Sequence, residues 1–198
     1  MRIQIANSDQ PTKRLWLELP IANDPTMSKT IGKMASLIEP GQTQVTVIVT
    51  DIEAPVPNLG KYILTDDFNT GIEQMNRLAQ KISVMDGITL SKFSGALDIE
   101  PVNSMGDIQR IADSLDDYEL LPGVTTDYDY GYHVLYETDL EERDIEPLEE
   151  LKDFIDFEAY GKYRMEEDGV RETDLGMMRR ISEPFNPERN MEMGGLSQ

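Results

Sequence analysis

The sequence contains no cysteine and a single histidine, His133. The absence of cysteine excludes disulfides, thiol catalysis and cysteine-ligated zinc or iron–sulfur centres. A single histidine also excludes a metal site built from two histidines of one chain. The first eight residues lack the apolar core of a signal peptide, and no apolar run approaches the ~20 residues of a membrane-spanning helix. We therefore expect a protein of the cytoplasm.

Basic residues are scarce as well. The 198 residues include 18 lysines and arginines against 38 aspartates and glutamates, which gives a formal net charge of −20. This excess is larger than solubility requires, and its self-repulsion destabilises a compact state. Nucleic acids and anionic membranes are polyanions themselves, so the composition excludes both as natural partners.

The excess negative charge is concentrated in residues 98–158, called the acidic segment below. This segment carries twenty acidic residues and three basic ones, whereas residues 1–97 carry ten and nine, and residues 159–198 carry eight and six. Apolar residues interrupt the acidic segment, among them Ile108, Ile111, Leu121, Val134, Leu151 and Ile155. Such a mixture is typical of folded chain rather than of a disordered tail, so we expect the acids on a fixed surface.

Hydrophobic periodicity predicts an α+β fold that begins with a small α+β domain at residues 1–60. Residues 2–6 and 13–20 alternate as strands do, and residues 43–51 form a β-branched run. Between them, apolar residues at helical spacing follow a helix-start signal at Asn23 and end before Pro40.

A helical domain is predicted next, over residues 61–117, after a boundary rich in proline and glycine. Its first helix carries an apolar stripe from Phe68 to Ile82, its second is a short segment at 88–97, and its third begins at Ser104.

Residues 118–175 are predicted to form an acidic α+β domain. Residues 118–121 are a candidate strand, and residues 127–136 fit either a helix or a strand, with helix favoured. A helix is expected at 147–160, ended by Gly161, with a hairpin turning at Asp168-Gly169. Residues 176–198 show no period, and we expect an extended or disordered tail.

Catalytic and metal-binding motifs are missing from the sequence. Asp127-x-Asp129 resembles the start of a calcium loop, but the twelfth position of that loop is Thr138 instead of glutamate. Glutamate pairs such as Glu141-Glu142 lie in surface-like sequence, whereas general acid–base pairs need burial to separate their pKa values. No nucleophile motif, phosphate loop or dinucleotide-binding turn is present. We expect a protein without catalytic activity, metal or cofactor.

The predicted helix at 147–160 carries an acidic face beside its apolar one. Acids three or four residues apart lie ~5–6 Å apart on a helix, a spacing of the same order as that of phosphates along DNA. A solvated helix face is the ordinary interpretation, yet it leaves the scarcity of bases unexplained. Phe154 and Phe157 lie outside the apolar stripe of this helix, where they belong either to the edge of the core or to a contact between subunits.

Three stretches of sequence, taken in order, resemble the ArdA-type antirestriction proteins. Leu151–Gly161 (LKDFIDFEAYG) is similar to the acidic, aromatic signature near the C-terminus of that family. Ile5–Asn7 with Trp16–Ile21 resembles its opening, and Thr50–Glu53 with Ile72–Leu78 resembles a further segment. The resemblance covers roughly residues 1–175.

The resemblance implies both a fold and an activity. Members of the family are encoded on mobile elements and are elongated, acidic, three-domain dimers that look like bent B-form DNA. They occupy the DNA groove of type I restriction–modification enzymes and block cutting. The nearly neutral residues 1–97 depart from the acidity that is usual in the family, and residues 176–198 have no counterpart in its short members.

We therefore predict a homodimeric DNA mimic without catalytic activity, whose partner is the specificity and methyltransferase subunits of a type I enzyme. Two alternatives stay open: mimicry aimed at another DNA-binding protein, such as a CRISPR effector, nucleoid protein or regulator, and a metal-dependent enzyme that uses clustered carboxylates. The predicted dimer contact consists of Phe154 and Phe157. The predicted partner-binding surface consists of Asp113, Asp116, Asp117, Glu119, Asp127, Asp129, Glu137, Asp139, Glu141, Glu142, Asp144, Glu146, Glu149, Glu150, Asp153, Asp156 and Glu158.

Overall fold

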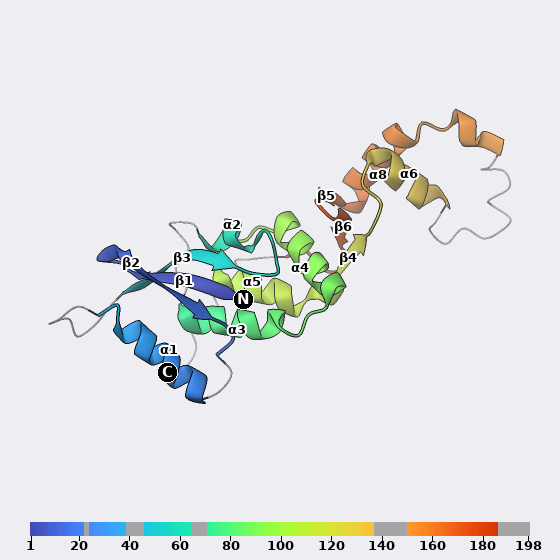
Figure 1. The fold of residues 1–198 in the computed structure, drawn as a ribbon. Coiled ribbons are helices and arrows are strands. Elements are labelled where there is room, and N and C mark those ends of the chain that lie inside the picture. Colours follow the sequence, from blue (N-terminus) through green and yellow to red (C-terminus); the bar gives the residue numbers. More distant parts are fainter. Residues whose placement is uncertain (22–23, 39–45, 65–70, 137–149, 186–198) are drawn as a thin grey trace, which may run out of the picture.

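The fold is α+β, with two small antiparallel sheets and helices around them. The structure, a computed structural model, describes residues 1–21, 24–38, 46–64, 71–136 and 150–185. Figure 1 shows an elongated arrangement in which the first sheet lies toward one end and helices α6 and α8 lie at the other. The predicted fold class is confirmed.

The first sheet has the strand order β2-β1-β3, with β1 antiparallel to both neighbours. Its strands are β1 (Arg2–Asn7), β2 (Gln10–Glu18) and β3 (Val47–Glu53), and helix α1 (Asp24–Ala35) lies between β2 and β3 in the chain. Alternation places Ile3, Ile5 and Leu17 in the core. The strands and the helix predicted for this part are confirmed, with small shifts of their ends.

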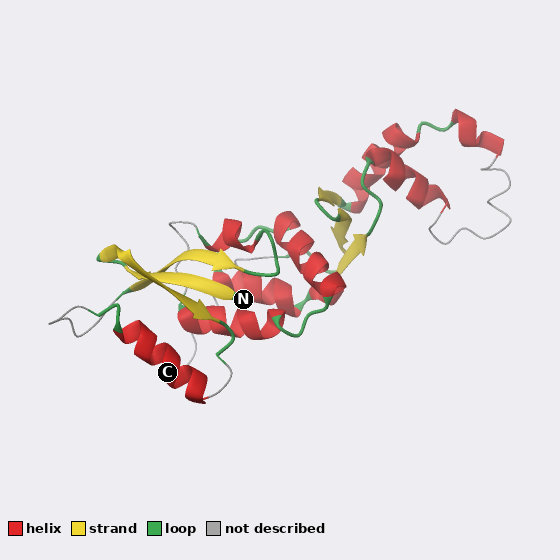
Figure 2. Ribbon diagram, in the orientation of Figure 1, coloured by secondary structure: helices red, strands yellow, loops and turns green. Residues whose placement is uncertain are grey.

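Helices pack beside this sheet, as Figure 2 shows. They are α2 (Leu59–Ile63), α3 (Ile72–Ile82), α4 (Gly87–Ile99) and α5 (Met105–Asp113). The predicted stripe of α3 is buried at Met75, Leu78, Ala79 and Ile82, and Ser104 caps α5 as expected. These helices share one hydrophobic core with the first sheet. The division of this core into domains at residue 60 stays a prediction.

The second sheet has the order β4-β6-β5 and lies against α4. A short 3-10 helix, η1 (Leu115–Asp117), leads into β4 (Tyr118–Leu121), which was predicted, and the other strands are β5 (Arg171–Thr173) and β6 (Gly176–Arg180). We expected a tail from residue 176, but residues 176–180 are instead the central strand. Met177 and Met178 are both fully buried, but they belong to different core clusters. Because both faces of this strand are buried, its apolar residues do not alternate with polar ones, and the sequence shows no strand period.

The remaining helices form a pair, α6 (Asp127–Tyr136) and α8 (Phe157–Asp168), called the α6–α8 pair below. The helix favoured for 127–136 is confirmed. The prediction of one continuous helix over 147–160 is wrong in its described part, because a 3-10 turn, η2 (Lys152–Phe154), is followed by non-helical Ile155 and Asp156 before α8 begins. Residues 147–149 lie outside the described residues. Asp156 caps α8 by accepting a hydrogen bond from the Ala159 amide.

The end of α8 also differs from the prediction. The helix continues through Gly161 and ends at Gly169, which has a left-handed φ of 67°. Asp168-Gly169 is therefore the end of a helix, and the turn predicted there is wrong. The hairpin of this part is formed by β5 and β6 and turns at Asp174 and Leu175.

Candidate functional site

The two helices of the α6–α8 pair touch each other through their backbones at Gly131 and Gly161. A Cβ atom on Gly161 would overlap the carbonyl oxygen of Asp127 and lie 2.8 Å from the amide nitrogen of Gly131. A Cβ atom on Gly131 would overlap the carbonyl oxygen of Phe157 and lie 2.9 Å from the amide nitrogen of Gly161. The two glycines therefore allow a distance between the helices that no other residue permits. This contact explains why Gly161 lies inside a helix that the sequence predicted it to end.

Aromatic side chains fill the rest of the contact between these helices. Tyr128, Tyr132 and Tyr136 recur every four residues along α6, and the ring of Phe157 lies 5.2, 5.7 and 6.0 Å from theirs. The rings of Tyr132 and Tyr136 stack at 4.7 Å, and the Lys152 ammonium lies over both.

Only one of the two phenylalanines predicted at the dimer contact is available to a partner. Phe157 is 4% exposed in the single chain, where it packs against the tyrosines of α6. We therefore assign Phe157 to the core instead of the dimer contact. Phe154 is 85% exposed, and the neighbouring Leu151 is 53% exposed. An apolar surface of this kind is typical of a contact between proteins.

A hydrogen-bonded cluster also joins α6 to α8. The Tyr130 hydroxyl donates to Asp168 Oδ2 at 2.9 Å, and Arg164 binds both oxygens of that carboxylate. Burial, together with the hydrogen bond to Asp168, raises the pKa of Tyr130 to about 12. The phenol is thus protonated at neutral pH and serves as a donor that fixes the two helices relative to each other.

Exposed carboxylates lie on α8 and on the segment just before it. Glu150, Asp153 and Glu158 are exposed, and within the described ranges none of them takes part in an ion pair. Asp156 is exposed too, but it caps α8. Asp129 is half-buried in the first turn of α6, where hydrogen bonds from Thr126 and Thr125 to its carboxylate lower its pKa. Asp127 is half-buried at the start of α6.

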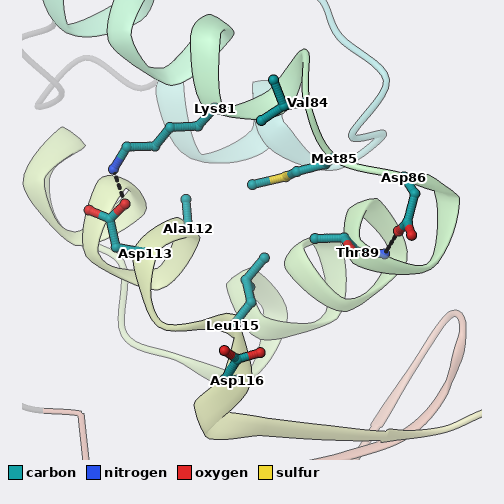
Figure 3. Close-up of a pocket in the computed structure, with 9 residues that line it drawn as sticks. All are labelled: Lys81, Val84, Met85, Asp86, Thr89, Ala112, Asp113, Leu115 and Asp116. Carbon is teal, nitrogen blue, oxygen red and sulfur yellow. Dashed lines mark hydrogen bonds and ion pairs between the residues drawn. The ribbon is translucent and has the colours of Figure 1, made fainter.

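A second group of predicted acids is paired with basic residues from outside the acidic segment. Asp113 pairs with Lys81 of α3, as Figure 3 shows. Glu119 binds Arg179 of β6 at 2.6 Å, and Asp117 binds Arg180 of the same strand at 3.0 Å. Asp116 is exposed and has no ion-pair partner among the residues that the structure describes.

Arg180 is the centre of the deeper part of this network. Its guanidinium also contacts Glu100 at 3.2 Å and the Tyr118 hydroxyl at 2.6 Å, and Tyr118 donates to Glu100 at 2.9 Å. Burial and the Glu100 carboxylate raise the pKa of Tyr118. This network attaches β6 to the end of α4, so its acids stabilise the fold and are not available to a partner. Sequence reasoning missed Glu100 and Arg180; the adjacent arginines at 179–180 in so acidic a chain were the available signal.

The predicted acidic surface therefore divides into a free group, a paired group, and the three residues Asp127, Asp129 and Asp156 at the starts of α6 and α8. The free group comprises Asp116, Glu150, Asp153 and Glu158, and the paired group comprises Asp113, Asp117 and Glu119. Seven further predicted residues lie outside the described residues: Glu137, Asp139, Glu141, Glu142, Asp144, Glu146 and Glu149.

Metal-binding and membrane-spanning features were searched over the same described residues. They contain no group of three histidine or acidic side chains placed to hold a metal ion. None of their helices combines the length and the apolar character needed to cross a membrane.

Comparison with known proteins gives a family. A search of curated proteins found no match. The model of the family described as "Antirestriction protein (ArdA)" matches residues 14–179, a range that includes the α6–α8 pair, nearly all of the second sheet, and β3 with part of β2 from the first sheet. Because that range is well over half of the chain, the protein belongs to the ArdA family of antirestriction proteins.

Proposed function

We propose that this protein inhibits type I restriction–modification enzymes by occupying their DNA groove as a mimic of DNA. The observation that carries the proposal is the free carboxylates of Glu150, Asp153 and Glu158, displayed on α8 and the segment just before it, in a chain that belongs to an antirestriction family. The target, the specificity and methyltransferase subunits of the enzyme, would present lysine and arginine side chains that otherwise contact phosphates.

The physical basis of the mimicry is an exchange of ligands. Basic side chains of a DNA groove release phosphates and bind carboxylates, so the long-range attraction that steers DNA also steers the inhibitor. The glycine contact and the buried Tyr130–Asp168 hydrogen bond hold the acidic side chains on a fixed scaffold. A fixed scaffold loses little conformational entropy on binding. Inhibition by this exchange needs no cofactor. It takes place in the cytoplasm, where restriction enzymes meet incoming DNA.

The proposal is tested by DNA cleavage with a purified type I enzyme titrated with this protein. We expect cleavage to stop at a ratio set by stoichiometric binding, with the inhibitor recovered unchanged. Full cleavage at a large excess of inhibitor would contradict the proposed target. Inhibition by traces of the protein, far below the enzyme concentration, would indicate catalysis.

We further propose that the protein acts as a homodimer with Phe154 at the contact. Truncation of a buried interface aromatic typically costs ~2–4 kcal/mol of association free energy, a factor of thirty to a thousand in Kd. Phe154→Ala should therefore give a folded protein that dissociates at higher concentrations than the wild type. Sedimentation across a dilution series measures this change.

Phe157→Ala is the matched control, because the same side chain is removed from the core instead of the surface. Loss of a buried phenylalanine costs ~3–5 kcal/mol of folding free energy, so the melting temperature of this variant should fall at every concentration. If Phe154→Ala sediments as the wild type does, Phe154 is not at the dimer contact.

A further inference from the structure

Two aliphatic side chains are exposed where α3 ends and α4 begins. Val84 is 84% exposed and Ile88 is 75% exposed, and the adjacent Met85 is partly buried. These three residues are called the Val84–Ile88 surface below. A pocket of about 430 Å³ opens on one side of Asp86, and another of about 480 Å³, lined in part by Ile88 and Leu175, opens on the other.

The lining of the first pocket is mixed, with apolar side chains at its centre and polar ones around them. Figure 3 shows Met85 and Leu115 pointing toward one another across it, with Ala112 beside them. In water, exposed aliphatic side chains contribute nothing to the stability of the single chain, and their burial by a partner is favourable. The pockets beside the Val84–Ile88 surface have room for a side chain of that partner.

The rim of the same pocket is acidic. Asp86 and Asp113 stand on opposite sides of it in Figure 3, and Asp116 lies below. The Asp86 carboxylate accepts a hydrogen bond from the Thr89 amide at 2.8 Å, which lowers its pKa. Lys81 is the one basic residue of this lining, and it is paired with Asp113. An apolar centre with an acidic rim is complementary to an apolar side chain flanked by basic ones.

We infer that the Val84–Ile88 surface binds a basic partner protein that inserts an aliphatic or aromatic side chain, flanked by lysine or arginine, beside Asp86. This inference rests on the proposed function, since a restriction enzyme that binds DNA has the required basic surface. A second copy of this chain fits poorly, because the dimer contact is proposed at Phe154 and two copies of this surface would bring their acidic rims together.

The contact would differ from mimicry in its dependence on salt. Carboxylates that replace phosphates give an affinity that falls as salt screens the charges, whereas burial of aliphatic side chains is not screened. DNA presents no aliphatic ridge beside its phosphates. The Val84–Ile88 surface would therefore allow the inhibitor to bind its target at salt concentrations that weaken DNA binding.

The test replaces both exposed aliphatic residues by serine, Val84→Ser with Ile88→Ser. Because both side chains are exposed, the melting temperature should stay at the wild-type value. Binding to a purified type I restriction–modification enzyme, measured by calorimetry or biolayer interferometry, should weaken at least tenfold at every salt concentration. The slope of log Kd against log salt should not change, since no charge is removed. Ile31→Ser is the matched control, because Ile31 is 59% exposed on α1.

The outcomes distinguish a failure of the inference from a failure of the proposed function. Wild-type protein that fails to bind the enzyme overturns both. Wild-type protein that binds, with a double variant of equal affinity, overturns the inference alone. A double variant that sediments as a lighter species than the wild type assigns the surface to a second copy and also overturns the inference.

Discussion

Replacing Gly161 by alanine should destabilise the α6–α8 pair and abolish most of the inhibition. The added Cβ would overlap the carbonyl oxygen of Asp127 and lie 2.7 Å from its carbonyl carbon. These are backbone atoms of a helix, which cannot rotate away as a side chain does. We expect a loss of at least about 3 kcal/mol in the free energy of unfolding, the upper end of the usual cost of overpacking. In a chain of this size the melting temperature should fall by about 6–12 °C.

Gly32→Ala is the control for this prediction. Gly32 lies within α1, and a Cβ there would meet no atom within 4 Å. Alanine is the better helix former by ~1 kcal/mol, so this variant should be slightly more stable than the wild type. Thermal melting and amide hydrogen exchange of α6 and α8 measure both changes. If Gly161→Ala melts and inhibits as the wild type does, the two helices do not touch at Gly161.

The second large effect is expected from removal of the free carboxylates. The triple variant Glu150→Gln, Asp153→Asn, Glu158→Gln should bind the target enzyme about 3–150 times more weakly, because three exposed ion pairs at ~0.2–1 kcal/mol each sum to ~0.6–3 kcal/mol. By the rule for phosphate contacts, the slope of log Kd against log salt should become shallower by up to about one for each carboxylate removed. Because less negative charge remains to repel, the melting temperature should stay level or rise.

A matched variant removes the same charge from the nearly neutral part of the chain. Asp9, Glu18 and Asp51 are exposed on or beside the first sheet. Their replacement by the corresponding amides also lowers the net negative charge by three. If both triple variants lose affinity equally, the total charge of the protein matters and the placement of the carboxylates on and just before α8 does not.

Most of the described secondary structure before residue 137 follows from the sequence, because strands and helices such as β1 and α3 have one buried face. Met75 and Ile82 recur at helical spacing, and Ile3 and Ile5 alternate, so periodicity marks the buried side. The secondary structure after residue 150 does not follow from the sequence in the same way, because helix capping and tertiary contacts override the hydrophobic periodicity there. Leu151, Ile155 and Ala159 are spaced as in one helix, yet the chain is capped anew at Asp156.

The candidate site could be predicted only as a set of acidic residues. Which of them are free depends on partners far away in the chain: Lys81 lies 32 residues from Asp113, and Arg179 lies 60 residues from Glu119. A count of bases within the acidic segment cannot include such partners. The role of Phe157 was likewise undetermined, because the tyrosines that cover it belong to another helix.

Displacement of DNA from the enzyme tests the central proposal most directly. A labelled duplex bound to a purified type I restriction–modification enzyme would be titrated with this protein at several salt concentrations, and fluorescence anisotropy would report the bound fraction. Mimicry predicts complete displacement, with an apparent affinity that falls as salt rises. A ternary complex that retains the duplex, or an affinity independent of salt, would show that the protein binds outside the DNA groove and would contradict the proposal.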